Sequence, residues 1–218
     1  SDRFFLLESV EGGEKWARYS FLGYDPILRA TCKNGTVTLE GAENRTVETD
    51  KPLSVLREVL SRYRAPHIEG LPPFTGGFVG YFAYAMLGYA EPTLKIKRGA
   101  WDDFDLMLFD KVITFDHFRQ KVILIVNIRC ENLETEYHKA EVELETMRRL
   151  LSDGEMAPLE PGRCTSDFRA LFDKERYCSM VEKAKHYIRE GDIFQVVLSN
   201  RLEADYEGSL LNTYRVLR

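Results

Sequence analysis

Short runs of β-strand character, rich in apolar residues and broken by turn residues, open the chain. Four such runs cover residues 3–9, 17–22, 27–32 and 36–40. The pair Asn34-Gly35 separates the last two runs and favours the tight turn of a β-hairpin. We therefore expect antiparallel strands at the start of the chain.

Three later segments change to the period of an amphipathic helix. Asp50 is expected to cap the first, while Asn132 and Gly154 are expected to open and close the second. Asp173 is expected to cap the third, which Gly191 ends. The apolar stripe of the second helix is Leu133, Tyr137, Ala140, Leu144, Met147 and Leu151. Such stripes should pack against the strands.

Further strands are predicted at residues 104–115 and 120–128, joined by a hairpin loop at 116–119, and at 192–199. The segment 192–199 is apolar on both of its faces, so it should be buried from both sides. Hairpins that do not alternate one by one with helices favour an α+β fold. We predict a largely antiparallel, sandwich-like β-sheet with flanking helices.

Residues 153–167 contain two prolines, two glycines and no periodicity, which is typical of a linker. This linker separates a predicted region at 1–152 from a second region at 168–218. The chain starts at Ser1 rather than Met, and Arg218 falls within a helical pattern. We therefore expect a piece of a longer polypeptide.

Composition narrows the class of protein. The 218 residues include 30 Lys and Arg against 35 Asp and Glu, a formal charge of -5, which argues against a dedicated nucleic-acid binder. No apolar run approaches the roughly 20 residues that span a bilayer, and no leader pattern stands at the N-terminus. The four cysteines lack metal-ligand spacing. We expect a soluble cytoplasmic protein without a membrane or nucleic-acid partner.

Familiar catalytic signatures are missing from the sequence. Gly76, Gly77 and Gly80 lack the spacing of a phosphate-binding loop, which favours tight backbone packing instead. The four histidines stand isolated, and no nucleophile motif accompanies them. Glu8 and Ser9, by contrast, end an apolar strand, as a site for an amino acid with a ring side chain would require. A strand end that meets solvent is the alternative interpretation.

Gln195 lies inside the apolar segment 192–199 and needs a partner if it is buried. A buried amide of this kind is either structural or lines a site.

Several motifs, in this order along the chain, resemble component I, the large subunit, of anthranilate synthase. They are L-L-E-S-V-E-G-G at 6–13, A-R-Y-S-F-L-G at 17–23, P-P-F-T-G-G-F-V-G-Y at 72–81, F-D-H at 115–117, Y-I-R-E-G-D-I-F-Q-V-V-L-S at 187–199 and Y-R-V-L-R at 214–218. The resemblance covers nearly the whole chain. It implies the N-terminal part of the fold of that subunit.

The resemblance also implies an activity. Enzymes of this family convert chorismate to anthranilate and release pyruvate, with Mg2+ as cofactor and with ammonia that a glutaminase subunit obtains from glutamine. The motifs that grip chorismate, donate a catalytic histidine and bind Mg2+ follow Arg218 in the family. We therefore expect this chain to be inactive by itself.

Feedback inhibition by tryptophan is implied as well. A zwitterion with an indole ring needs an acceptor for its amine, donors for its carboxylate and an apolar slot. The resemblance assigns this site to Glu8, Ser9, Arg18, Tyr19 and Ser20. It also places Gln195 where water-adding relatives typically have a lysine base. An amide cannot abstract a proton near neutrality, so Gln195, as a residue lining the active site, favours an amine-using enzyme.

Two other functions remain open. One is the large subunit of aminodeoxychorismate synthase, which differs in its product. The other is a module that binds an aromatic amino acid without chemistry. Open strand edges, and apolar faces around residues 193–198, also predict that the chain forms dimers or larger species by edge pairing.

Overall fold

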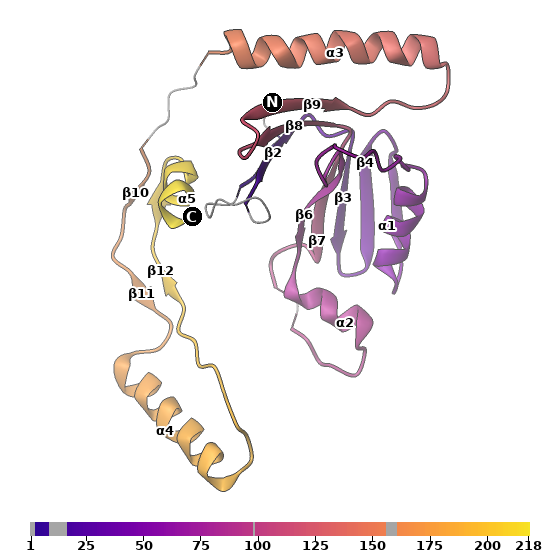
Figure 1. The fold of residues 1–218 in the computed structure, drawn as a ribbon. Helices are drawn as coiled ribbons and strands as arrows, with labels where there is room; N and C mark the ends of the chain where they lie inside the picture. Colours follow the sequence, from indigo (N-terminus) through magenta and orange to yellow (C-terminus); the bar gives the residue numbers. More distant parts are fainter. Residues whose placement is uncertain (1–2, 9–16, 98, 156–160) are drawn as a thin grey trace. The chain divides into compact units, whose positions relative to one another are not determined.

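The computed structural model describes residues 3–8, 17–97, 99–155 and 161–218 (Figure 1). The chain forms two compact units, residues 1–155 and residues 156–218. All strand pairs in the described residues are antiparallel, and helices flank the sheets. The predicted α+β class is confirmed.

Two sheets make up most of the first unit. The four-stranded sheet has the order β1-β2-β8-β9, and the five-stranded sheet has the order β5-β4-β3-β7-β6. The strands are β1 (Phe4–Leu7), β2 (Tyr19–Tyr24), β3 (Leu28–Lys33), β4 (Thr36–Gly41), β5 (Arg45–Glu48), β6 (Gly77–Phe82), β7 (Phe104–Phe109), β8 (Lys111–Asp116) and β9 (Lys121–Val126). The predicted hairpin turn is confirmed, because Asn34 and Gly35 join β3 to β4 with φ angles of 52° and 85°.

The single strand predicted at 104–115 is instead two strands in different sheets. β7 ends at Phe109, β8 begins at Lys111, and Asp110 forms the corner between them. The backbone N–H and the side-chain Nδ2 of Asn127 both donate to the Asp110 carbonyl oxygen, at 2.7 and 2.9 Å. Side chains continue to alternate through a strand that switches sheets, so the sequence pattern did not reveal this corner.

Apolar residues from both sheets and one helix form two buried clusters. Helix α1 (Pro52–Ser61) covers one face of the five-stranded sheet. A second cluster, centred on Phe5, Phe109 and Val112, includes residues of both sheets. The first cluster consists of Leu28, Ala30, Cys32, Val37, Leu39, Val55, Leu56, Val59, Phe104, Leu106 and Leu108. These contacts place the two sheets and α1 in one packed body.

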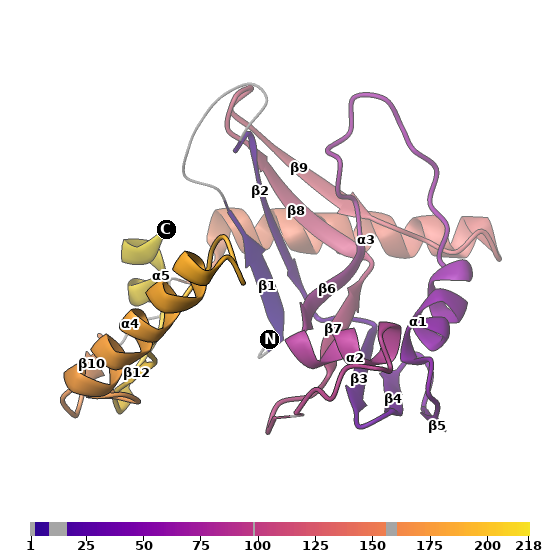
Figure 2. The same cartoon turned by 90° about the horizontal axis from the view of Figure 1, so that it is seen from below.

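Helix α3 (Leu133–Asp153) packs against β9 and crosses it obliquely in Figure 2. Its predicted bounds at Asn132 and Gly154 are confirmed. Only Met147 of its apolar stripe is fully buried, whereas Leu133 and Tyr137 are exposed. The helix therefore contacts the sheet through part of the stripe that the sequence predicted.

Other local predictions have mixed outcomes. The cap predicted at Asp50 is wrong, because α1 begins after Lys51, whose N–H donates to the Thr49 hydroxyl. The tight packing predicted around Gly80 is confirmed, since a Cβ atom there would overlap the Asp105 carbonyl oxygen. A 3-10 turn (Tyr84–Met86) and α2 (Leu87–Ala90) follow β6 and lead towards β7.

The second unit contains helices and short strand pairs. Its elements are β10 (Arg163–Cys164), β11 (Arg169–Ala170), α4 (Lys174–Glu190), β12 (Leu202–Glu203), β13 (Tyr206–Glu207) and α5 (Leu211–Leu217). Strand β10, which pairs with β13, lies inside the predicted linker. The predicted ends of α4 are confirmed, because the Asp173 side chain accepts from the Arg176 N–H at 2.8 Å and Gly191 has a φ of 81°.

The strand predicted at 192–199 is wrong, because this segment has no regular secondary structure. No described strand pairs with it, so no hydrogen-bonded ladder can form. Its side chains are not buried on both sides either, since Phe194 is 99% exposed and Val197 is 82% exposed. An apolar pattern alone therefore did not produce a strand.

Candidate functional site

The residues that the resemblance assigns to tryptophan gather at one end of the four-stranded sheet. Arg18 directly precedes β2, which begins with Tyr19 and Ser20. Glu8 follows the last residue of β1, and β1 pairs with β2. Ser9 lies outside the described residues. The structure thus brings four of the five predicted residues to the same strand ends.

Arg18 is held by an ion pair with Asp116, the last residue of β8. Its Nε and Nη2 atoms donate to the two carboxylate oxygens of Asp116 at 3.0 and 2.7 Å. The side chain of Asp116 is only 2% exposed, and that of Arg18 is 19% exposed. Hydrogen bonds from Arg18 lower the pKa of Asp116 to about 2. The two parallel bonds fix the plane of the guanidinium as well as its position.

The guanidinium of Arg18 also lies over aromatic rings. Its central carbon is 4.8 Å from the ring centre of Tyr19 and 5.5 Å from that of Phe118. The Tyr19 ring is 5.9 Å from the Phe21 ring, which is 5.7 Å from Phe74. This row of rings provides an apolar surface beside a charged group, as an aromatic zwitterion requires.

Ser20 is hydrogen-bonded to His117, one of the histidines that were expected to be isolated. The Ser20 Oγ and His117 Nε2 atoms are 2.7 Å apart. Ser20 is 5% exposed, so its oxygen can be approached along few directions. The pair is better suited to fixing the direction of the hydroxyl than to activating it. The expectation of an isolated histidine is therefore wrong for His117.

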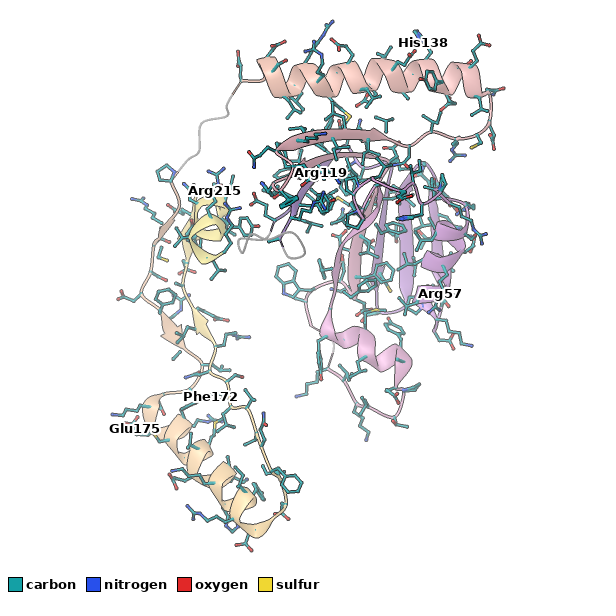
Figure 3. All side chains as sticks on the ribbon, viewed as in Figure 1. Arg57, Arg119, His138, Phe172, Glu175 and Arg215 are labelled. Carbon is teal, nitrogen blue, oxygen red and sulfur yellow. The ribbon has the colours of Figure 1, made fainter. Side chains whose placement is uncertain are left out.

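The turn between β8 and β9 supports these contacts. Asp116 Oδ1 accepts from the Arg119 N–H at 3.0 Å, which closes the turn. The His117 N–H donates to the Arg18 carbonyl oxygen at 2.9 Å. Figure 3 labels His138 on the side of α3 away from the sheet. The sequence contained the F-D-H motif at 115–117, but only the fold shows that it faces β2.

Asp103 is a second buried carboxylate that the sequence analysis missed. It is 2% exposed and accepts hydrogen bonds from the Tyr89 hydroxyl at 2.7 Å and the Asn34 N–H at 2.9 Å. Burial raises the pKa of both Tyr89 and Cys32, which border it. These bonds tie the β3–β4 turn to α2. No motif in the sequence marks this carboxylate, because its partners are distant along the chain.

Gln195 stands on the irregular segment 192–199 of the second unit and is exposed. The expectation that its amide is buried is therefore wrong for this structure, because no strand forms around it. Its role in lining an active site stays a prediction.

No group of three acidic, histidine or cysteine side chains in the described residues could hold a metal ion. The described residues thus do not fit Mg2+, and the expectation that its ligands follow Arg218 stays a prediction. A shallow pocket lies in the loop after α1, between Ala65 and Thr75. None of the helices that the structure describes could cross a membrane.

Comparisons with known proteins agree on one family. A family model for chorismate binding enzymes matches residues 3–218. Anthranilate synthase component 1 of Aquifex aeolicus is 38% identical over 98% of this chain and 44% of its own length. The same protein of Acetivibrio thermocellus is 36% identical over 98% of this chain and 46% of its own length.

A solved structure shows the same fold. The crystal structure of anthranilate synthase component I from Streptococcus pneumoniae has a TM-score of 0.71 and 29% sequence identity. The match covers 96% of this chain and 47% of that one. This chain thus spans about half the length of the relatives that it matches.

Proposed function

This chain belongs to the family of chorismate binding enzymes, and from that premise we propose that it is the N-terminal region of an anthranilate synthase component I. The full-length protein converts chorismate and ammonia to anthranilate and pyruvate. The observation that carries the proposal is the similarity over 98% of the chain to proteins of that name. The ordered motifs at 6–13, 17–23 and 187–199 support it.

The role of this region in the full-length protein is regulation. Tryptophan binds at the end of the four-stranded sheet, to Glu8, Ser9, Arg18, Tyr19 and Ser20. The clustering of four of these residues and the aromatic row beside Arg18 support this site. Because Asp116 neutralises Arg18, hydroxyl and N–H donors also have to serve the ligand carboxylate.

Catalysis takes place outside the residues named for tryptophan. Gln195 lines the chorismate site and favours ammonia over water, and the residues that bind Mg2+ follow Arg218. Ammonia comes from a glutaminase subunit, and both proteins are cytoplasmic. Residues 1–218 by themselves do not turn over chorismate.

The experiment is a turnover assay on the full-length protein with chorismate, Mg2+ and ammonium salt. Anthranilate should form, and adding tryptophan should slow its formation. Residues 1–218 assayed in parallel should be inactive. Chorismate left unchanged by the full-length protein would refute the proposed reaction.

The product separates the two enzyme alternatives. Aminodeoxychorismate in place of anthranilate would assign the chain to aminodeoxychorismate synthase. Tryptophan binding without any turnover of chorismate would instead support the binding module. The R-Y-S-F-L-G and D-I-F-Q-V-V-L-S segments favour anthranilate synthase.

Isolated residues 1–218 are also proposed to self-associate. Exposed apolar side chains such as Phe168, Phe194 and Val216 support this, because they would be covered by contact with another copy. Light scattering should detect dimers or larger species at high concentration, and a strict monomer would contradict it.

A further inference from the structure

We infer that His117 is a positioning residue of the tryptophan site, which acts by fixing the direction of the Ser20 hydroxyl. The inference rests on the proposed tryptophan site. His117 itself does not touch the ligand, and its effect passes through Ser20.

The first argument is the contact itself. The two side chains meet at 2.7 Å although they are 97 residues apart in the sequence. A serine hydroxyl has one donor and two acceptor sites and rotates freely unless a partner holds it. A bond to His117 uses one of these sites and directs the others. This holds in either imidazole tautomer, since the tautomer only decides which of the two groups donates.

The second argument is that His117 is held in place on its backbone. Its N–H donates to the Arg18 carbonyl oxygen, and its own carbonyl oxygen accepts from Gln120 Nε2 at 2.6 Å. Asp116 closes the same turn through the Arg119 N–H. These bonds hold the backbone from which the imidazole projects, and the bond to Ser20 then joins the ring to β2.

The third argument is that two neighbouring residues of one turn hold two of the residues proposed to bind tryptophan. Asp116 binds the side chain of Arg18, and His117 binds the side chain of Ser20. Arg18 directly precedes β2, and Ser20 is the second residue of that strand. The turn therefore sets the geometry of this end of β2, where the proposed ligand binds.

Burial makes the direction of the hydroxyl decisive. Ser20 is 5% exposed, so a ligand can approach it along few directions. If the Ser20 hydroxyl pointed away from the ligand, the polar group of the ligand beside it would be buried without a hydrogen bond, and the affinity for the ligand would fall. Fixing the hydroxyl before binding removes that cost.

The test is tryptophan titration by calorimetry on the full-length protein and its variants. His117→Ala should weaken tryptophan binding roughly three- to tenfold, the equivalent of one hydrogen bond. His117→Gln should restore most of the affinity, because its amide reaches the place of Nε2. His117→Asn should not, because its amide occupies the place of Nδ1. His138→Ala, on the exposed side of α3, is the matched control and should bind as the wild type does.

A double-mutant cycle separates positioning from general support. In a Ser20→Ala background, the His117→Ala change should cost no further affinity, because the residue through which it acts is gone. Urea unfolding of each variant identifies those that fail to fold, and His117→Gln still tests the inference if His117→Ala is one of them.

The outcomes are distinguishable. If the wild-type protein binds tryptophan and the two substitutions are additive, or if His117→Asn rescues as well as His117→Gln, the inference is overturned and the proposed function stands. If the wild-type protein does not bind tryptophan, both the site and the inference are overturned.

Discussion

The two units of this chain both contain helices and antiparallel strands, but they differ in how many side chains they bury. In the described residues, all buried apolar side chains belong to the first unit, including Phe104 at 0% exposure. No described residue of the second unit is buried, although α4 has a complete cap at each end. Caps and turns are local devices, whereas a core needs surfaces from several elements. The contrast shows that local sequence preferences can form a capped helix even where no core forms around it.

Ion pairs show the same contrast. In the first unit, the side chains of Arg18 and Asp116 are 19% and 2% exposed. In the second, those of Arg169 and Asp205 are 58% and 66% exposed. Water screens the second pair, so it should contribute little to stability.

The largest expected effect is in hydrogen exchange of isolated residues 1–218. Amides of β3 and β7 lie beside buried side chains and should exchange at least about 100-fold more slowly than amides of α4, because local opening of α4 exposes no core. Mass spectrometry of deuterium uptake measures this difference. Equal protection in β3 and α4 would break the comparison.

A matched pair of phenylalanine substitutions gives the next effect. Phe104→Ala should lower the free energy of unfolding of residues 1–218 by about 3–5 kcal/mol, since it empties a buried site. Phe194→Ala removes a ring that is 99% exposed and, in protein dilute enough to be monomeric, should change the free energy of unfolding by less than about 0.5 kcal/mol. Urea denaturation followed by circular dichroism measures both. A cost at Phe194 comparable to that at Phe104 would show that the second unit is packed.

The ion pairs predict a difference in pH dependence. The pKa of Asp116 is lowered to about 2, so the stabilisation from its charge is complete above the unfolded-state pKa of roughly 3.9 and is lost as the pH falls towards 2. The difference in Tm between wild type and Asp116→Asn should therefore shrink between about pH 4 and pH 2.

The control for this window is Asp205→Asn in the second unit. Hydrogen bonds from Arg169 also lower the pKa of Asp205, but the pair is exposed. The Tm of this variant should follow that of the wild type at every pH. A pH-dependent difference in Tm for Asp205→Asn as large as that for Asp116→Asn would contradict the contrast between the two ion pairs.

The smallest expected effect is a substitution that stabilises the protein instead of destabilising it. The Thr114 hydroxyl is fully buried in β8 and is without a hydrogen-bond partner in the structure. Thr114→Val keeps the shape and removes this unpaired group, so it should raise the free energy of unfolding by about 1 kcal/mol. Thr165→Val, at an exposed position of the second unit, should leave it unchanged. Destabilisation by Thr114→Val would mean that the hydroxyl does have a role.

Predictions from the sequence succeeded where a feature depends on neighbours along the chain. The Asn34-Gly35 turn, the Asp173 cap and the ends of α3 all follow from backbone preferences of a few residues. The motifs were also sufficient to indicate the family, because each is a contiguous run of residues. The cap expected at Asp50 shows the limit, since Thr49 and Lys51 offered a competing local bond.

Other features depended on pairing between distant segments, and only the tertiary structure decided them. The corner at Asp110 divides one apolar run between two sheets, and the apolar segment 192–199 forms no strand because no described strand pairs with it. The contact between Ser20 and His117 likewise exists only because β2 pairs with β8. Local sequence therefore determined turns, caps and family motifs, while sheet pairing determined which distant side chains meet at the candidate site.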